Sequence, residues 1–259
     1  MARLTKLSRS VAGKVTLITG AGGGQGQSTA HLFADEGAHV AVTDLREDDV
    51  ERVVDQITEA GGSAKGWVMD VANAERVDQV VSEIADHFGG LDHLINNAGI
   101  SLFAAIDAEE YEDSWATSIE VLLTAHTRTI RSSLPHLRQS DSGRIVNVAS
   151  TEGWGATKFG SPYTAAKHGV IGLTKSLAVE LGREGITVNC ICPGPIDTAM
   201  TADIPAEDKL IFAKRRTALG RYAEPEEVAH GTLNFCLPAS QYMTGAILPV
   251  DGGLLIKNA

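Results

Sequence analysis

The feature that most constrains this chain is a short apolar run that leads into a cluster of glycines and then into a helical pattern. Residues 14–26 read Lys-Val-Thr-Leu-Ile-Thr-Gly-Ala-Gly-Gly-Gly-Gln-Gly, and an amphipathic segment continues to about residue 36. A strand, a glycine turn and a helix N-terminus in this order let the backbone approach a pyrophosphate, whose charge the free N–H groups and the helix dipole favour. We therefore predict that Gly20, Gly24, Gln25 and Gly26 bind the phosphates of a dinucleotide.

The same alternation of short apolar runs and helical periodicity continues along the chain. Strands are predicted near residues 14–19, 38–44, 64–70, 91–97, 143–150, 186–192 and 246–250. Helices are predicted near residues 25–36, 47–60, 73–88, 109–138, 161–183 and 225–236. Alternation of this kind predicts an α/β fold: a Rossmann-like, doubly wound parallel sheet of about seven strands with helices on both faces.

No linker or low-complexity tract divides the chain, so one domain over residues 14–259 is the simplest organisation. Residues 1–13 are predicted to form an N-terminal arm. The stretch 194–222 has no strand character and mixes apolar with charged residues. Long segments at the carboxyl end of a parallel sheet often cover the substrate, so we expect a substrate lid there.

Asp44 ends the second apolar run, eighteen positions after Gly26. A carboxylate at this place can accept hydrogen bonds from both ribose hydroxyls of an adenosine, and it repels a 2′-phosphate. Asp44 therefore predicts NAD rather than NADP as the cofactor. An ordinary turn residue at a strand end is the alternative interpretation.

Tyr163 and Lys167 stand four residues apart, with Ser150 thirteen residues before the tyrosine. Residues four apart share one face of a helix. A phenol has a pKa of about 10, and we expect the neighbouring ammonium to lower it. The pair is thus predicted to be a general acid/base, with the Ser150 hydroxyl bound to the same substrate oxygen. A surface tyrosine beside a solvated lysine is the alternative.

Together these motifs resemble the short-chain dehydrogenase/reductase family, in its short single-domain form. The resemblance runs from about Lys14 to Gly253, and its motifs are Thr19–Gly26, Asn96–Gly99, the Ser150, Tyr163 and Lys167 spacing, and the segments 193–198 and 243–253. It implies NAD-dependent interconversion of a secondary alcohol and a ketone, with these three residues as the catalytic groups. It also implies cofactor contacts by Asp70, Val71, Asn97, Tyr163, Lys167, Ile196 and Thr198, and a homotetramer.

Three other functions remain open. A 3-oxoacyl thioester reductase and a non-catalytic, nucleotide-sensing protein occur in the same family. An S-adenosylmethionine methyltransferase also uses a glycine turn and an acidic strand end, but it does not need the serine, tyrosine and lysine. Trp154 and Phe159 are candidates to line an apolar pocket, with packing under their loop as the alternative. The apolar residues of the lid and Trp154 favour a bulky or cyclic secondary alcohol, alicyclic or steroid-like, and a small polyol or a 3-hydroxyacyl thioester remains open.

Two positions depart from the family pattern. Gln25 stands where the family has an aliphatic residue. The family commonly places an asparagine seven residues after the bulky residue that Trp115 matches, where it supports a water-bridged proton relay from the lysine; here that position is Leu122. A leucine keeps the backbone carbonyl but favours a straighter helix.

Composition excludes several partners. The formal net charge of −11 argues against binding of nucleic acid and of anionic membranes. No apolar run approaches the ~18–20 residues that span a bilayer. The three cysteines and eight histidines show no disulfide or metal-site spacing, so we expect no metal. The basic segment with Arg3, Lys6 and Arg9 has no following apolar region, so it is not a secretory signal, and a cytoplasmic protein is expected.

Overall fold

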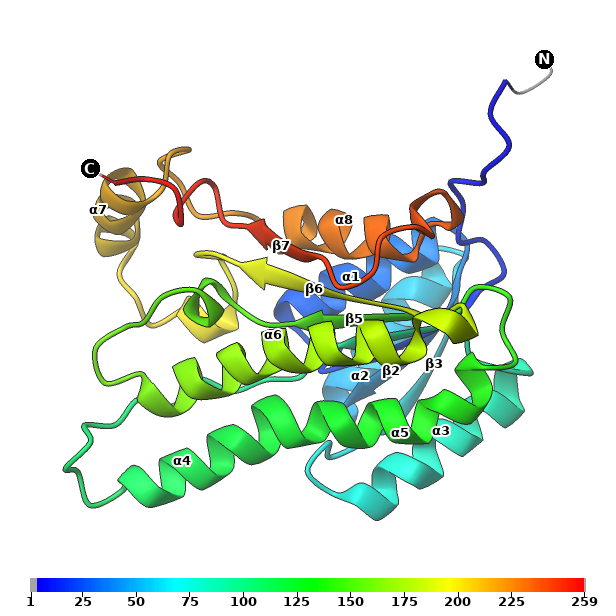
Figure 1. Cartoon of the computed structure of the whole chain (residues 1–259), viewed down its shortest axis with the longest axis horizontal. Coiled ribbons are helices and arrows are strands. Elements are labelled where there is room, and N and C mark those ends of the chain that lie inside the picture. Colours follow the sequence, from blue (N-terminus) through cyan, green and yellow to red (C-terminus); the bar gives the residue numbers. More distant parts are fainter. Residues whose placement is uncertain (1–3, 259) are drawn as a thin grey trace.

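A computed structural model describes residues 4–258 of the chain. Its centre is a parallel sheet in the order β3-β2-β1-β4-β5-β6-β7 (Figure 1). The strands are β1 (Val15–Thr19), β2 (His39–Asp44), β3 (Ser63–Val68), β4 (His93–Asn96), β5 (Arg144–Val148), β6 (Thr187–Pro193) and β7 (Ile247–Val250). The direction of winding reverses between β1 and β4, and ligands of such sheets bind at the carboxyl ends of the strands beside this reversal.

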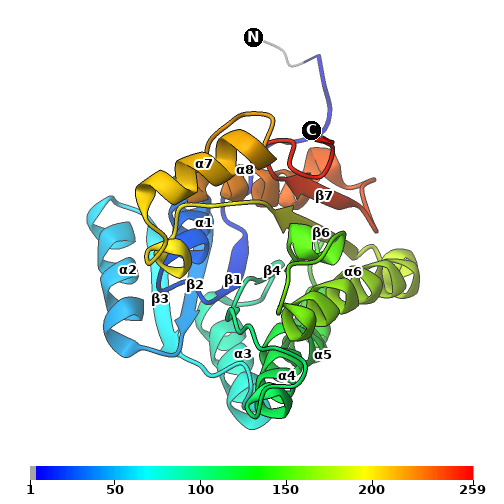
Figure 2. The same cartoon turned by 90° about the vertical axis from the view of Figure 1, so that its left-hand side faces the viewer.

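Helices cover both faces of the sheet, as Figure 2 shows end-on. They are α1 (Gly24–Asp35), α2 (Glu47–Glu59), α3 (Ala74–Phe88), α4 (Tyr111–Ile119), α5 (Ala125–Leu137), α6 (Ser161–Leu181), α7 (Ala206–Arg216) and α8 (Pro225–Cys236). α1, α2 and α8 lie on one side, and α3, α5 and α6 lie on the other. The predicted Rossmann-like, doubly wound fold is confirmed.

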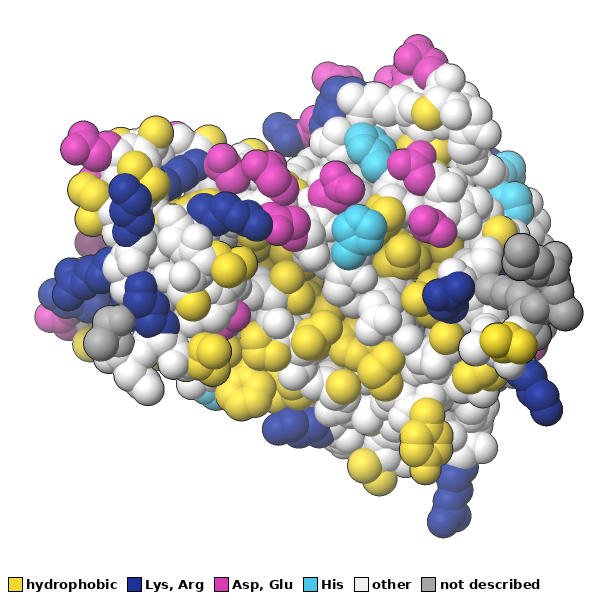
Figure 3. Space-filling model, turned by 90° about the horizontal axis from the view of Figure 1, so that it is seen from above, with side chains coloured by type: hydrophobic (Ala, Val, Ile, Leu, Met, Phe, Trp, Pro, Cys, Tyr) yellow, Lys and Arg dark blue, Asp and Glu magenta, His cyan; other side chains and the backbone are white. Residues whose placement is uncertain are grey.

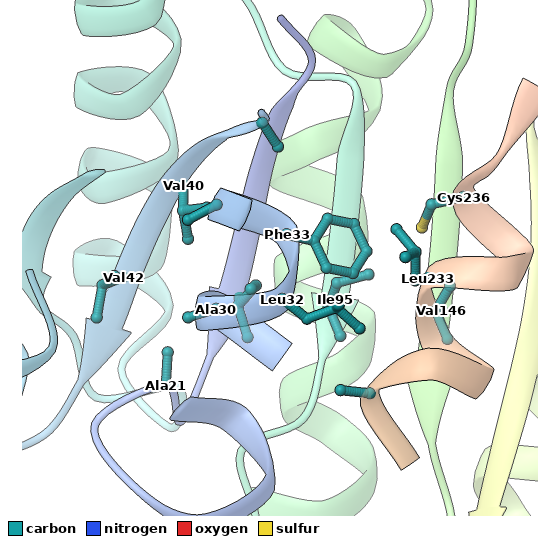
Figure 4. Packing of buried hydrophobic residues seen from close by; sticks show 14 of the residues in the cluster. Ala21, Ala30, Leu32, Phe33, Val40, Val42, Ile95, Val146, Leu233 and Cys236 are labelled. Atoms are coloured by element: carbon teal, nitrogen blue, oxygen red, sulfur yellow. The ribbon is translucent and has the colours of Figure 1, made fainter. Parts of the chain in front are cut away.

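Alternation along the strands explains the two-sided core. Ile18 of β1 faces the α1 and α8 side, whereas its neighbour Leu17 belongs to the cluster under α3 and α5. On the first side, Phe33 of α1 and Leu233 of α8 meet side chains from the central strands (Figure 4). Because both faces of β1 and β5 are covered, every residue of these strands is buried, including the polar Arg144 and Asn147 of β5.

Two details differ from the expected elements. The single helix predicted over 109–138 is divided: α4 ends at Ile119, a π-helical turn occupies Glu120–Thr124, and α5 follows. The expected lid contains a helix, α7, which lies at the end of the molecule where β5 and β6 terminate (Figure 1). Its charged residues outnumber its apolar ones, so its sequence lacks the clear apolar periodicity that predicts a helix.

The later part of the expected N-terminal arm packs against the body. Val11 is fully buried, and the Ser8 carbonyl accepts a hydrogen bond from the Ala239 backbone N–H over 2.8 Å. Leu4 is fully exposed, and Arg3 lies outside the described residues. Over residues 4–258, no helix is both long and apolar enough to cross a membrane.

Candidate active site

The glycine turn between β1 and α1 requires glycine for steric reasons. Gly20 and Gly24 have φ of 64° and 52°, a region that side chains rarely adopt. A Cβ on Gly26 would lie only 2.0 Å from the carbonyl oxygen of Gly20. No side chain caps the start of α1, and its first turn holds no acidic residue. Its terminal N–H groups are therefore available to an anion.

The Asp44 carboxylate is fixed at the end of β2. Its two oxygens accept backbone hydrogen bonds from Gly22 (2.9 Å) and Leu45 (2.7 Å). A Cβ on Gly22 would lie 2.9 Å from the Asp44 carboxylate, so glycine is also needed there. Sequence reasoning missed Arg46, which lines the same part of the cleft and pairs with Asp49. The position of Arg46, two residues after Asp44, was the sequence signal that could have placed it in the site.

Asn97 follows β4 and holds the glycine turn in place. Its side-chain amide donates to the carbonyl oxygens of Thr19 (2.9 Å) and Gly20 (3.0 Å). The contribution of Asn97 to the site is thus chiefly to shape the turn.

Asp70 follows β3, and its carboxylate accepts the Ala72 backbone N–H over 2.8 Å.

All the predicted cofactor residues line one cleft of about 410 Å³. It is lined by Gly20, Gly24, Gln25, Gly26, Asp44, Asp70, Val71, Asn97, Ser150, Tyr163, Lys167, Ile196 and Thr198, among others. The cleft extends from the end of β2, past the glycine turn, to the end of β5. Residues from distant parts of the sequence therefore meet at the carboxyl edge of the sheet.

Ser150 lies just beyond β5, and Tyr163 and Lys167 lie on the first turns of α6. The Lys167 ammonium is buried, 2.9 Å from the Val148 carbonyl oxygen to which it donates, and 5.5 Å from the centroid of the Tyr163 ring. The Ser150 hydroxyl accepts the backbone N–H of Glu152 over 3.1 Å. The arrangement offers a hydroxyl, a phenol and an ammonium to one region of the cleft.

The expectation that Lys167 lowers the phenol pKa is wrong for this structure. Burial raises the pKa of Tyr163 above its ordinary value; the hydrogen bond with Ser150 opposes this rise, and the Glu152 carboxylate adds to it. Burial also lowers the pKa of Lys167 to about 8, which negative charge on Cys190 and Cys192 would oppose. Lys167 is not among the groups that shift the pKa of Tyr163, and burial disfavours the charged form of both residues.

Leu122 lies at the centre of the π-helical turn, fully buried, and it lines the cleft. The Ala125 N–H bonds to the carbonyl of Glu120, five residues earlier, rather than to the residue four earlier. The expectation of a straighter helix is therefore wrong. The change in backbone bonding persists although no asparagine is present, and such π turns are frequent at functional sites.

Phe103 packs beside the catalytic phenol. The Phe103 ring stacks on Tyr163, with centroids 6.3 Å apart. Trp154 and Phe159, the candidates for an apolar pocket, are about half exposed and are not among the residues that line the cleft. Within the lid stretch, Met200 does line it. An apolar surface is thus present beside the catalytic groups.

Comparisons with known proteins identify the family. A family model described as "Enoyl-(Acyl carrier protein) reductase" matches residues 20–255. The chain is 38% identical over 240 residues to the (2S)-[(R)-hydroxy(phenyl)methyl]succinyl-CoA dehydrogenase subunit BbsD of Thauera aromatica, covering 93% of this chain and 96% of that one. It is 37% identical over 244 residues to the 3-oxoacyl-[acyl-carrier-protein] reductase FabG of Thermotoga maritima, with coverage of 94% and 98%.

A solved structure gives the same result. The fold is similar to that of a short-chain type dehydrogenase/reductase from Mycobacterium marinum, with a TM-score of 0.90, 31% identity, and coverage of 96% and 98%. The chain therefore belongs to the short-chain dehydrogenase/reductase family. Members of this family are oxidoreductases that bind a nucleotide cofactor.

The cleft fits such a nucleotide. The uncapped start of α1 and the glycines of the turn leave room and N–H donors for phosphates. Gln25 lines the cleft, and its side-chain Nε2 is buried without an acceptor among the described residues. A bound phosphate would supply one. Asp44 places a carboxylate at the other end of the cleft.

Proposed function

We propose that this member of the family is an NAD(H)-dependent oxidoreductase that interconverts a secondary alcohol and a ketone. The observation that carries the proposal is the meeting of Ser150, Tyr163 and Lys167 in the same cleft as Asp44 and the glycine turn. A catalytic acid/base group is thereby combined with a site for a dinucleotide.

The residues have separate roles in this proposal. The bound nicotinamide supplies the hydride acceptor for oxidation and the hydride donor for reduction. Tyr163 takes the proton from the substrate hydroxyl in oxidation and returns it to the carbonyl oxygen in reduction. Ser150 donates a hydrogen bond to that same oxygen. Lys167 would hold the nicotinamide ribose with the N–H groups that Val148 does not use.

NAD is favoured over NADP by the charge and anchoring of Asp44. A 2′-phosphate would meet a carboxylate that two backbone N–H groups hold in place. Arg46 is the nearby cation, but its guanidinium is paired with Asp49. Asp70, Val71, Asn97, Ile196 and Thr198 are proposed to complete the cofactor contacts. The three free, buried cysteines suit a reducing, cytoplasmic location.

The proposed substrate is a bulky or cyclic secondary alcohol. Phe103 and Met200 supply apolar surface near Tyr163 and the cleft. The Thauera relative is named for a substrate that carries both a phenyl group and a secondary hydroxyl. A panel of alicyclic, steroid and aryl alcohols with NAD, followed by NADH formation, tests the proposal. Absence of turnover with every alcohol and with the matching ketones would contradict it.

A 3-oxoacyl thioester reductase is the second candidate. Its support is the likeness to the Thermotoga reductase and the description of the matching family model. Reduction of acetoacetyl-CoA with NADH or NADPH, at higher kcat/KM than any cyclic ketone, would favour it. Cofactor binding without turnover of either substrate class would instead favour a nucleotide-sensing role.

A homotetramer is proposed from the exposed edge of the sheet. β7 is the terminal strand and is only half-buried, and Pro249 within it is exposed. Figure 3 looks onto this side of the molecule and shows hydrophobic side chains gathered at its centre. Apolar sheet edges favour pairing or burial. Light scattering at several protein concentrations should give four times the 27.3 kDa chain mass, and a constant monomer mass would contradict it.

A further inference from the structure

Glu152 connects the two segments that carry the proposed catalytic hydroxyls. It lies in the short 3₁₀ turn Thr151–Gly153, and its backbone N–H donates to the Ser150 hydroxyl. One oxygen of its carboxylate accepts the Thr157 hydroxyl over 2.7 Å, and the other accepts the Thr164 hydroxyl over 2.9 Å. Thr164 follows Tyr163 on α6. A single residue thus joins the serine loop to the tyrosine helix.

These bonds affect what Ser150 can do. A hydroxyl has one proton to donate and two lone pairs. The Glu152 N–H occupies a lone pair of Ser150 and not its proton, and the hydroxyl also hydrogen-bonds with the Tyr163 phenol. Both carboxylate oxygens of Glu152 are also engaged, and hydrogen bonds to an ionised acceptor are among the stronger ones in proteins.

The loop that Glu152 holds has a strained backbone. Phe159 has φ of 66°, the only non-glycine residue of the described chain with positive φ. Such a conformation is unfavourable for a side chain and persists only where the surroundings impose it. Here the Phe159 carbonyl accepts the Ala104 N–H and the Thr157 carbonyl accepts the Gly160 N–H, each over 2.9 Å. This ties the loop to the segment that carries Phe103.

Phe103 connects the strained loop to Tyr163. Its ring stacks on Tyr163, and a Cβ on Gly160 would lie 2.9 Å from its Cε1. The ring therefore lies between the end of the strained loop and the catalytic phenol. A change in the loop would alter the surface against which Tyr163 packs.

The charge of Glu152 is not neutralised by an ion pair among residues 4–258. The titratable groups on the elements around it are Lys158 on its own loop, Tyr163, Lys167, His168, Lys175 and Glu180 on α6, and Cys190 and Cys192 on β6. Lys158 lies over the Phe159 ring, 4.6 Å from its centroid, and Lys167 bonds to Val148. Burial is the larger cause that raises the pKa of Tyr163, and the Glu152 carboxylate raises it further.

We propose that Glu152 is a positioning residue for the reaction, which holds the Ser150 hydroxyl and the first turn of α6, with Tyr163, in a fixed relative arrangement. The inference rests on the proposed oxidoreductase function. In ketone reduction, the protonated phenol is the form that supplies a proton to the product oxygen. Glu152 therefore favours the acid form of the site, and alcohol oxidation requires a higher pH than it would without this carboxylate.

Three variants separate the effect of the Glu152 charge from the effect of its hydrogen bonds to Thr157 and Thr164. Glu152→Gln keeps polar atoms for Thr157 and Thr164 but removes the charge, so the acidic limb of the kcat profile for alcohol oxidation should move down by about half to one pH unit. Thr164→Val keeps the Glu152 charge but removes its hydrogen bond to α6, so kcat should fall while the acidic limb of the pH profile stays in place. Glu152→Ala removes both, and we expect a loss in kcat of about tenfold or more with little change in the KM for NAD. Glu59→Gln, at an exposed glutamate of α2, is the matched control.

A measurement without turnover tests the same claim. Ultraviolet difference titration of each protein against its Tyr163→Phe counterpart reports the Tyr163 phenol alone. The phenol should titrate at lower pH in Glu152→Gln than in the wild type. An unshifted titration in Glu152→Gln, together with full activity of Glu152→Ala, would overturn the inference.

The wild type is assayed first, so that a failure of the proposed function can be distinguished from a failure of the inference about Glu152. A wild type that turns over no alcohol or ketone contradicts the proposed function, whatever the variants do. An active wild type with unaffected variants contradicts only the role of Glu152. If Glu152→Ala does not fold, Glu152→Gln and Thr164→Val carry the test, with melting temperatures as the check of their fold.

Discussion

The buried ammonium of Lys167 donates a hydrogen bond to the carbonyl oxygen of Val148, 2.9 Å away. This bond fixes α6 to the end of β5, two residues before Ser150. It also holds a cation where water is largely absent, and burial lowers the pKa of Lys167 to about 8. The site therefore contains a charge whose burial opposes folding at neutral pH.

Lys167→Met should abolish turnover and stabilise the fold. Because the folded-state pKa of about 8 lies below the ordinary 10.5, the native state binds fewer protons than the unfolded state between these values. Wild-type stability thus rises with pH across this window. The gain in Lys167→Met should be largest below pH 8, at most about 3 kcal/mol, and should shrink towards pH 10.5. Thermal unfolding at several pH values checks this.

The exposed Lys175 on the same helix provides the control for that experiment. Lys175→Met should leave the melting temperature nearly unchanged at each pH. A Lys167→Met variant that is less stable than the wild type at pH 7 would show that the bond to Val148 outweighs the cost of burial.

Asp44→Ala should narrow the preference for NAD over NADP. In the wild type we expect at least ~10-fold higher kcat/KM with NAD, which corresponds to about 1.4 kcal/mol. Removing the carboxylate takes away both the ribose acceptor and the repulsion of the 2′-phosphate. Steady-state kinetics with both cofactors measure the change, and Asp48→Ala, at an exposed neighbour, controls for net charge. Equal efficiency of the wild type with the two cofactors would refute this assignment.

Leu122→Asn should change kcat by less than about tenfold, or 1.4 kcal/mol of barrier. The π-helical turn already forms with leucine, and the phenol and serine are in the cleft without an amide at this position. The asparagine must also replace a fully buried side chain, so some loss of stability is expected. Kinetics and thermal unfolding of the purified variant check both effects. An inert wild type that Leu122→Asn activates would mark the natural chain as non-catalytic.

Much of the fold was predictable from local patterns. Apolar runs such as 15–18 indicated strands, and alternation of these runs with helical periodicity predicted the parallel sheet. The boundaries of α7 were not predictable in this way. That helix is exposed at most positions and buries only Ala213, so it lacks the apolar stripe on which such predictions depend.

The site was predictable where a residue type and a chain spacing together limit the chemistry, as for Asp44, Tyr163 and Lys167. Two properties depended on three-dimensional surroundings instead. The raised pKa of Tyr163 results chiefly from burial, which spacing on a helix does not reveal. Glu152 gains its place from Thr157 and Thr164, five and twelve residues away, and a lone loop glutamate gives no sign of such contacts.

Tyr163→Phe tests the central claim most directly, because it removes only the phenolic oxygen from a ring that packs against Phe103. The measurement is kcat for oxidation of an alcohol that the wild type turns over, together with NADH binding followed by nicotinamide fluorescence. We predict that NADH binding survives while turnover falls at least ~100-fold, the range expected for loss of a general acid/base. Turnover near the wild-type rate, with NADH still bound, would contradict the proposal that Tyr163 transfers the proton.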